Sequence, residues 1–522
     1  MKMYAKKMIK FTTVLMGMMM FFPVFLLGKD TRNDETLIEN LALNQALFIK
    51  MVCEKNFDII YQKYDLEIAS EQIKKEQAIF EPKLTASYNH KDSISSNTAE
   101  QYFDRLGQDQ FQERISKYQL GVSGLLPTGT VYSLDYSIDD VDNDLIDTRY
   151  DDDTNKEASS YIGFQLTHPL LKNGGNKNTE TKIRIAKAVR DISYQAYRQK
   201  VMDIVFNALN AYWELYYTTK QYEIYKDSVQ IASNLLQTYR EMVDAGKVAE
   251  TELFEIKSGL ALRHSLLSAA YQKLVSAQNN MFQLLGQSRK NNKGIVYIPT
   301  DKPVFYEISE EITPDRVLKQ AFLYNPRYLS SLENIKKQDI HIEHAKNQCL
   351  PELNLKATAG VTSLDKHPEM FLKNIWNDND ESWSVGIEFQ LPLTGNMDSN
   401  SELRMTKIRK RQAALSLQAI QVNMENEVDT NVQNIHNSKI QVDRHTENVK
   451  LKQKIMDIEM NKLEGGKSNI IEVLEKEKGL NQAKNGHLRA IVNMELSGIA
   501  LRKVDGTLIE RYGVHVEKEK QE

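Results

Sequence analysis

One short segment carries side chains of the types that bind transition metals. His341 and His344 lie one helical turn apart and flank Glu343, and imidazole and carboxylate groups are common zinc ligands. Charged and polar residues surround them, as is typical of a hydrophilic helix face. We therefore expect these three residues to lie on such a face rather than in a metal site.

A second stretch, over 135–153, is rich in aspartate and partly mimics a calcium-binding loop. Leu145 occupies the position where the sharp turn of such a loop needs glycine, and aspartate replaces the bidentate glutamate at its end. We expect a solvated loop here, and whether it binds divalent cations stays open. The aspartates with the spacing of calcium ligands are Asp140, Asp142, Asp144 and Asp151.

Enzyme motifs are absent from the sequence. It contains no Walker loop, no G-x-S-x-G elbow, no H-E-x-x-H motif and no C-x-x-C pair. The formal net charge is −4, and no basic stripe with interleaved aromatic residues, as in nucleic-acid-binding proteins, occurs. We expect a protein that is not an enzyme, uses no cofactor and binds no nucleic acid.

The N-terminus has the pattern of a signal peptide. Four lysines within the first ten residues precede an apolar stretch over 11–27. This stretch is short for a transmembrane helix, which needs about 20 residues, and we expect cleavage near Gly28; an uncleaved anchor is the alternative. No later stretch is apolar enough to span a bilayer as a helix, so further membrane insertion has to use strands.

The chain repeats itself with a long period. Residues 246–286 align with 466–506 at an offset of 220, and a second match has an offset of 269. The two offsets differ by 49, which indicates an insertion in the first half between the two matched regions. Residues that coincide include Gly246 with Gly466, Gly286 with Gly506, Asn56 with Asn325, and Pro82 with Pro351.

Two long runs, 170–298 and 393–522, contain no proline, a residue that breaks helix interiors. Their apolar residues recur at steps of three and four, which predicts long helices packed in bundles or coiled coils. Gly246 and Gly466 mark reversals, because glycine adopts the positive φ that ends a helix. The predicted helical hairpins span 178–286, with a tip at 244–252, and 397–505, with a tip at 464–473.

Segments with a period of two precede each predicted hairpin. In the clearest one, Val385, Ile387 and Phe389 alternate with polar residues. Strands of membrane barrels need one apolar and one polar face, although a half-buried strand of a soluble sheet shows the same alternation. The signal peptide favours the membrane. The predicted strands lie near 83–90, 117–126, 130–137, 159–168, 352–361 and 384–392.

These elements form two consecutive units with the same plan of helix, strands and helical hairpin. We expect a loose segment at the start of the mature chain, over 29–44. The predicted parts are a signal peptide (1–28), a first repeat (29–286) with a helix over 45–80 and strands over 83–168, an equatorial connector (287–313), a second repeat (314–506) with a helix over 314–350 and strands over 352–392, and a charged C-terminal tail (507–522).

This order of elements resembles the TolC family of outer-membrane efflux proteins over about residues 37–510. The tip sequences G-K-V-A-E-T-E-L from Gly246 and G-K-S-N-I-I-E-V-L from Gly466 are similar to the family's G-x-x-x-x-x-D-V tips, with glutamate in place of aspartate. The strand end T-H-P-L-L from Thr167 is similar to the family's Q-P-L-L pattern.

The resemblance implies a fold that is mainly α with a membrane β-barrel portion. Strands of a homotrimer would close one barrel in the outer membrane, and the helices would form a periplasmic tunnel. The tips would meet a periplasmic adaptor protein, which joins the channel to an inner-membrane pump of the RND or ABC type. The implied adaptor contacts are Gly246, Lys247, Val248, Gly466, Lys467 and Ser468.

The resemblance also implies an acidic constriction at Glu472 and Glu475, with Glu252 at the matching place of the other tip. Three-fold symmetry would turn each glutamate into a ring of like charges; ordinary helix-surface glutamates are the alternative. The implied function is a passive exit duct of a tripartite efflux or type I secretion system, and a non-channel periplasmic coiled-coil scaffold is the alternative.

Two features depart from the family's pattern. A basic residue often lies two places after the second-tip glycine, where this chain has Ser468. The chain also has six predicted strands, whereas the family usually has four. It therefore either contributes to a wider barrel or carries an extra hairpin outside the barrel.

Overall fold

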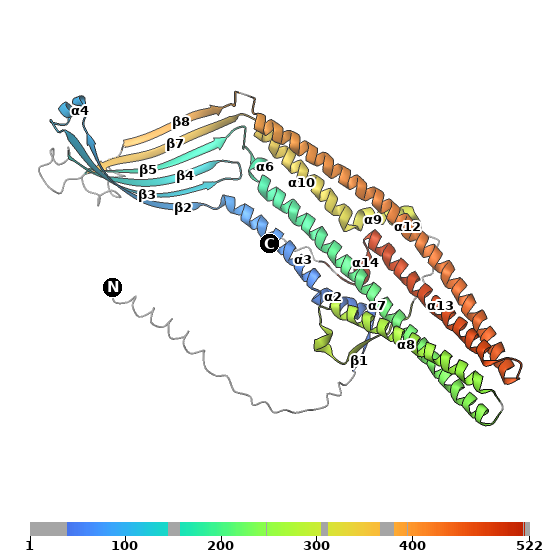
Figure 1. The fold of residues 1–522 in the computed structure, drawn as a ribbon. Helices are drawn as coiled ribbons and strands as arrows, with labels where there is room; N and C mark the ends of the chain where they lie inside the picture. The colour runs from blue at the N-terminus through green and yellow to red at the C-terminus, as the bar shows by residue number, and fades with distance from the viewer. Residues whose placement is uncertain are drawn as a thin grey trace, which may run out of the picture.

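The computed structural model is elongated, with a β-sheet at one end and two helical hairpins that point away from it (Figure 1). It describes residues 39–144, 157–246, 248–303, 312–365, 380–393, 395–514 and 516. The predicted signal peptide over 1–28 lies outside the described residues, as do Leu145 and Asp151 of the acidic stretch. The main helices are α2 (Gln45–Lys55), α3 (Phe57–Gln77), α7 (Thr181–Asp244), α8 (Glu250–Leu284), α9 (Pro314–Tyr324), α10 (Pro326–Gln348), α12 (Met397–Glu464) and α13 (Ile470–Asp505).

Each repeat begins with two helices where the sequence predicted one. The chain breaks at Asn56 and at Asn325, whose backbones are extended and whose side chains cap the helix that follows. Asn56 Oδ1 accepts from the backbone N–H of Asp58 at 3.0 Å, and Asn325 Oδ1 accepts from that of Arg327 at 2.9 Å. A side-chain acceptor at this position satisfies N–H groups that the helix itself leaves unpaired.

In each repeat, the two regions that match between the repeats contact each other through one equivalent hydrogen bond. The amide of Asn56 donates to the carbonyl of Leu284, and that of Asn325 to the carbonyl of Val504, both at 2.9 Å. Beside each acceptor lies a glycine with positive φ, 65° at Gly286 and 81° at Gly506. The asparagine therefore fastens the first helix break of a repeat to the end of its returning helix.

The strands of both repeats form one antiparallel sheet, in the order β2-β3-β4-β5-β7-β8. Strands β5 and β7 join the repeats, and β2 and β8 are the edges. All six strands are present where the alternation predicts them, and most extend beyond the predicted bounds. They are β2 (Lys83–Ser96), β3 (Gln110–Leu125), β4 (Val131–Asn143), β5 (Glu157–Pro169), β7 (Glu352–Asp365) and β8 (Asp380–Gln390).

Residues 135–143 of the acidic stretch belong to β4, so the prediction of a loop was wrong for these residues. Basic side chains on the neighbouring strand β3 explain why these aspartates can lie in a strand. Lys117 Nζ lies 3.3 Å from Asp139 Oδ2, and Arg114 Nη1 lies 3.5 Å from Asp142 Oδ2. Opposite charges that face each other across two strands stabilise the pairing.

The register gives the sheet one apolar and one polar face. Residues that pair directly from strand to strand form rows across all six strands. One row consists of Leu84, Val122, Leu134, Phe164, Ala359 and Trp383, and the row beside it on the other face consists of Lys83, Ser123, Ser133, Gln165, Thr358 and Ser384. A two-faced sheet of this kind fits between lipid and water.

The helices next to the sheet form a layer in the order α3, α7, α10 and α12, because α7 packs against α3 and α10, and α10 packs against α12. Helices α3 and α12 are therefore the outer members of the layer. They continue directly into the edge strands: α3 leads into β2 through a short 3₁₀ turn, η1 (Ala78–Phe80), and β8 leads into α12 (Figure 1).

The main hydrophobic core surrounds the middle of α7 and includes part of the segment that the sequence predicted to be loose (29–44) and part of the predicted charged C-terminal tail (507–522). Residues 39–43 form β1 (Glu39–Leu43), which pairs in parallel with β6 (Ile295–Pro299) inside the predicted connector. The predicted tail contains α14 (Leu508–Arg511), because the side chains of Leu508 and Ile509 are buried in this core.

Within the described part of the chain, none of the helices combines the length and the apolar character that a membrane-spanning helix requires.

Replacing Asn325 by alanine should destabilise the start of α10 by roughly 2–3 kcal/mol, because a helix cap and a buried hydrogen bond are lost together. Asn44→Ala is the control: Asn44 is exposed and caps α2 through one bond to the N–H of Leu47, and caps of this kind contribute about 1 kcal/mol. Amide hydrogen exchange of the first turn of each helix measures both effects. Equal losses at the two caps would contradict the role of the Asn325 contact.

Candidate functional site

The free ends of the two helical hairpins hold the residues that the resemblance singled out. At the first tip Gly246, with φ 70°, ends α7, and its N–H donates to the carbonyl of Val243 at 2.8 Å. At the second tip Gly466, with φ 67°, ends α12. There the N–H of Lys467 donates to the carbonyl of Lys462 at 2.8 Å, which completes a Schellman cap.

The two tips pack against each other through a small apolar cluster. Its buried residues come from all four helices, so the cluster joins the hairpins rather than only the helices within each. Val248, one of the predicted adaptor contacts, packs against it from the first tip. The buried members are Tyr239 of α7, Leu253 and Ile256 of α8, Met456 of α12, and Ile470, Val473 and Leu480 of α13.

The predicted adaptor contacts do not share one environment. Gly246, Gly466 and Lys467 are exposed, and Lys247 lies outside the described residues. The hydroxyl of Ser468 donates to the carboxylate of Glu459 in the last turns of α12. This hydrogen bond, assisted by Lys462 Nζ at 3.2 Å, lowers the pKa of Glu459. Ser468 thus stabilises the second tip through a contact inside its own hairpin.

The predicted constriction residues lie on exposed or half-exposed helix surface. Glu472 pairs with Lys476 at 3.3 Å, and Glu475 pairs with Lys478 at 3.8 Å, each within α13. Glu252 is half-buried at the start of α8. Lysines so close to two of the three glutamates reduce the like-charge repulsion that a symmetric ring of these carboxylates would create.

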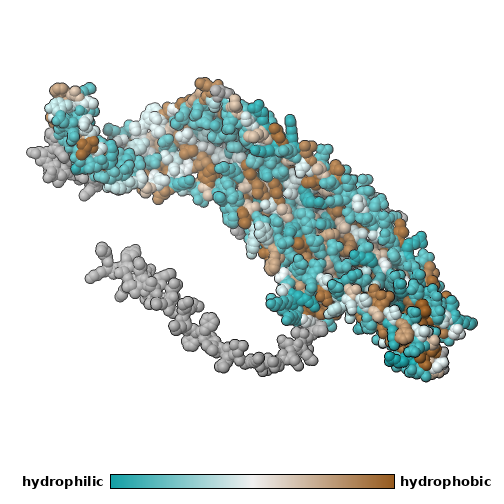
Figure 2. All heavy atoms as spheres, in the orientation of Figure 1, coloured by the Kyte–Doolittle hydropathy of each residue, from teal (hydrophilic) through white to brown (hydrophobic). Residues whose placement is uncertain are grey.

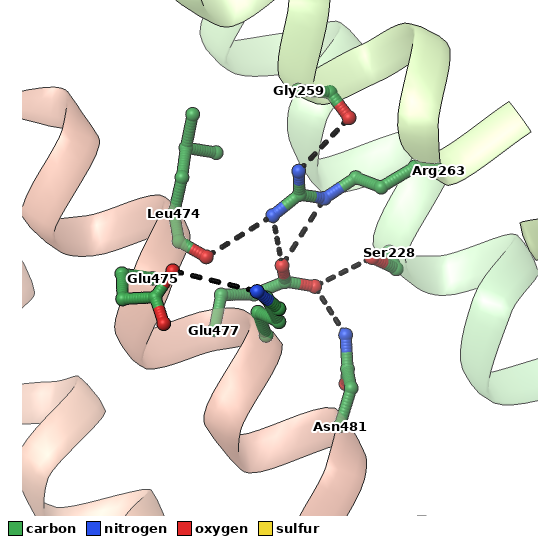
Figure 3. Close-up of polar contacts among 8 residues, drawn as sticks. Ser228, Gly259, Arg263, Leu474, Glu475, Glu477 and Asn481 are labelled. Atoms are coloured by element: carbon green, nitrogen blue, oxygen red, sulfur yellow. Dashed lines mark hydrogen bonds and ion pairs between the residues drawn. The ribbon is translucent and has the colours of Figure 1, made fainter.

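Sequence reasoning missed the most buried charges near the tips, Arg263 of α8 and Glu477 of α13. Their side chains are only 7% and 5% exposed, and they form an ion pair (Figure 3). Arg263 Nε donates to Glu477 Oε2 at 3.1 Å. Glu477 also accepts from Ser228 Oγ at 2.6 Å and from the amide of Asn481.

Arg263 also donates to two main-chain carbonyls. Nη1 donates to the carbonyl of Gly259 at 3.0 Å and Nη2 to that of Leu474 at 3.3 Å. Residues of α7, α8 and α13 therefore share one polar contact that links the first hairpin to the second (Figure 3). A buried ion pair is stable only with such additional hydrogen bonds.

A signal for this pair is present in the sequence. The buried side of α13 near the tip runs through Ile470, Val473, Glu477 and Leu480, at steps of three, four and three. A glutamate in an apolar seam requires a buried partner. The partner itself is 214 residues away, and no local pattern identifies it.

The surface beside the ion pair is hollow and partly apolar. The hollow lies between α8 and α13, with a volume of about 540 Å³, and Leu262 and Leu266 form part of its wall. Ile471, which also lines the hollow, is exposed. Figure 2 shows that apolar patches occur among the hydrophilic surface close to this end of the molecule.

Two of the three candidate metal ligands of α10 contact residues of α7, and one of these contacts joins His344 Nδ1 to the hydroxyl of Thr181 at 3.4 Å. Glu343 pairs with Arg184 of α7 at 2.7 Å, and this bond lowers the pKa of Glu343. Burial lowers the pKa of both His341 and His344. Among the residues that the structure describes, no three histidine, cysteine or acidic side chains are grouped so that they could hold a metal ion.

Comparison with known proteins decides the family. A family model described as "Outer membrane efflux protein" matches residues 48–287 and 318–507. The chain belongs to the outer membrane efflux protein family. The match includes both helical hairpins and all six strands of the sheet, which makes this an outer-membrane efflux channel with its helical part in the periplasm. No curated protein sequence matches the chain.

Solved structures of efflux channels share the fold of this family member. The Campylobacter jejuni CmeC outer membrane channel superposes with a TM-score of 0.62 at 16% identity, covering 89% of this chain and 86% of CmeC. The Vibrio cholerae outer membrane protein VceC gives 0.61 at 13%, covering 88% and 96%. The open state of the Neisseria gonorrhoeae MtrE outer membrane channel gives 0.60 at 14%, covering 88% of each chain.

Glu477→Ala should loosen the contact between the hairpins, because it leaves Arg263 buried without its partner, a change that costs about 3–5 kcal/mol. Amide exchange in the tip segments of α8 and α13 should then accelerate about a hundredfold or more, since about 1.4 kcal/mol corresponds to a factor of ten.

Glu475→Ala is the matched control, because this neighbouring glutamate is exposed and its ion pair should contribute less than about 1 kcal/mol. The double variant Arg263→Met with Glu477→Leu removes both charges and should restore most of the protection. Equal exchange in the Glu477 and Glu475 variants would show that the buried pair does not hold the tips together.

Proposed function

We propose that three copies of this chain form a passive exit channel. An inner-membrane pump of the RND or ABC type supplies the energy, and a periplasmic adaptor joins pump and channel, as in tripartite efflux or type I secretion systems. The proposal rests on one observation. In a single chain the sheet has unpaired edges at β2 and β8, and the helix layer ends at α3 and α12, the helices that connect to these two strands.

The sheet ends at β2 and β8 with unpaired main-chain groups. In lipid each unpaired N–H or C=O costs several kcal/mol, so an open edge is not tolerated there. Every strand neighbours an antiparallel one, and β2 leaves the helices while β8 returns to them. An edge strand β8 of another copy therefore meets β2 in the antiparallel orientation.

The outer helices below these edges also lack partners for their apolar residues. On α3 the exposed apolar side chains follow steps of four, three and four, and on α12 they follow steps of three and seven, as expected for helix-packing seams. Helix α12 exposes basic residues along this seam, whereas α3 is net acidic. The exposed residues are Phe57, Tyr61, Tyr64 and Ile68 of α3, and Met405, Ile408, Leu415 and Val422 of α12, with Arg404, Lys407 and Arg411.

At rest the tips narrow the channel, with Glu252, Glu472 and Glu475 facing the pathway. The buried contact between Arg263 and Glu477 holds the second hairpin against the first, so that opening requires this contact to change. The adaptor binds around Gly246, Lys247, Val248, Gly466 and Lys467, and Ser468 shapes the tip from within. The hollow beside Leu262 offers an apolar surface for a partner helix.

The alternative, a periplasmic coiled-coil scaffold without a channel, leaves the two-faced sheet unexplained. It predicts that purified protein gives no conductance in a lipid bilayer. A channel predicts discrete conductance steps and, because of its carboxylates, cation selectivity.

Planar-bilayer recordings test the proposed gate through Glu472→Ala combined with Glu475→Ala. Removing these carboxylates should raise the conductance of the resting channel and weaken its block by trivalent cations, since fewer negative charges then face the pathway.

Glu447→Ala is the control, because Glu447 is an exposed glutamate of α12 that also pairs within its helix, with Arg444 at 3.3 Å. This variant should conduct like the unmodified protein. If the double variant also conducts and is blocked like the unmodified protein, Glu472 and Glu475 are not part of the gate.

A further inference from the structure

The hairpin of β2 and β3 has the properties of a barrel wall. All 14 residues of β2 pair in register with β3, from Lys83 opposite Ser123 to Ser96 opposite Gln110. The apolar row through Leu84 and Val122 continues without a shift into β4, β5, β7 and β8. A hairpin that stood outside the wall, in water, would not need this apolar face.

The exposed side chains of the hairpin support this placement. Leu84 is 70% exposed and Trp383, at the other end of the same row, is 79% exposed. Soluble proteins rarely expose large contiguous apolar patches to water. The residues beside them on the opposite face, Lys83 and Ser384, are polar, so lipid fits one side of both edge strands and water fits the other.

The position of α3 fixes the hairpin at the edge of the sheet. Helix α3 is the outer member of the helix layer, and only Glu81 and Pro82 separate η1 from β2. Strand β5 continues into α7, the next helix of the layer, through residues 170–180. Strands β3 and β4 must therefore fill the arc above these two neighbouring helices.

The widths of the two layers agree with this arrangement. Strands lie about 4.8 Å apart across their hydrogen bonds, which becomes roughly 6.5 Å along the circumference at a tilt of about 40–45°. The six strands of one chain then cover about 39 Å of arc. Four packed helices at about 8–10 Å each cover roughly 32–40 Å, so the sheet and the helix layer match in girth.

We propose that three copies close a barrel of 18 strands, six from each chain, in which β2 of one copy pairs with β8 of the next. This inference rests on the proposed trimeric channel and defines its wall and its seam. Barrel diameter grows roughly in proportion to strand number, and barrels of about 16–18 strands enclose an aqueous channel. The bore in the membrane is therefore as wide as the helical tunnel, and the tips alone limit the size of the cargo.

Cysteine crosslinking in outer membranes tests the seam directly. In a Cys53→Ala, Cys349→Ala background, Ala86→Cys on the apolar face of β2 is combined in turn with Val385→Cys, Ile387→Cys and Phe389→Cys on the apolar face of β8. Copper–phenanthroline oxidation should give covalent dimers and trimers for at least one of these combinations. Ala86→Cys with Gly386→Cys or Glu388→Cys should give none, because directly paired residues share one face.

A parallel set with Leu134→Cys or Tyr136→Cys on β4 tests the arrangement in which the hairpin lies outside the wall. Crosslinks between β4 and β8, with none from β2, would overturn the 18-stranded barrel while leaving the trimeric channel intact. Samples of each two-cysteine variant that have not been oxidised show on non-denaturing gels whether that variant assembles. If they assemble as trimers and neither strand crosslinks to β8, the proposed seam is wrong; if no trimer forms even without the new cysteines, the proposed function fails as well.

Discussion

The unpaired main-chain groups of β2 and β8 are the constraint on which the rest of the structure depends. A single chain has a two-faced sheet that suits a membrane and two edges that do not, because lipid offers no hydrogen-bond partners. The helix layer below it ends at α3 and α12, directly beneath the same edges. The proposed assembly, which joins like chains edge to edge, removes both defects, and it accounts for strands and helices of both repeats that lie side by side rather than in separate domains.

Stability is distributed unevenly along the molecule, in a way that suits a channel with a movable end. The centre is held by the large core around α7, with β1, β6 and α14 packed on it and with the capped breaks at Asn56 and Asn325. The tips depend on a small apolar cluster and on one buried ion pair between Arg263 and Glu477. A buried ion pair contributes modest net stability, so in the proposed channel a partner protein can change this contact without disturbing the centre.

Much of this architecture could be predicted from the sequence, because its periods are local. Steps of three and four placed the hairpins, glycine placed their tips, and alternation placed the strands. The helix break at Asn56 could not be predicted, because no proline marks it. The charged end of β4 has the composition of a loop, and only the structure shows that Lys117 and Arg114 lie opposite its aspartates. The pairing of β1 with β6 and of Arg263 with Glu477 joins segments more than 200 residues apart, and single-sequence patterns carry no information on such contacts. The resemblance of the tips to the family predicted a role for Glu472 and Glu475 on the helix surface and gave no indication of the buried Glu477.

The number of chains in the assembled particle tests the account most directly. Native mass spectrometry of the processed protein, released from detergent micelles, measures it without reference to any single residue. The proposed closure of both open edges by three like chains predicts a particle of three chains and no stable monomer. A protein that is folded and monomeric after purification from the outer membrane would contradict the account, because its sheet would then have to tolerate two open edges in lipid.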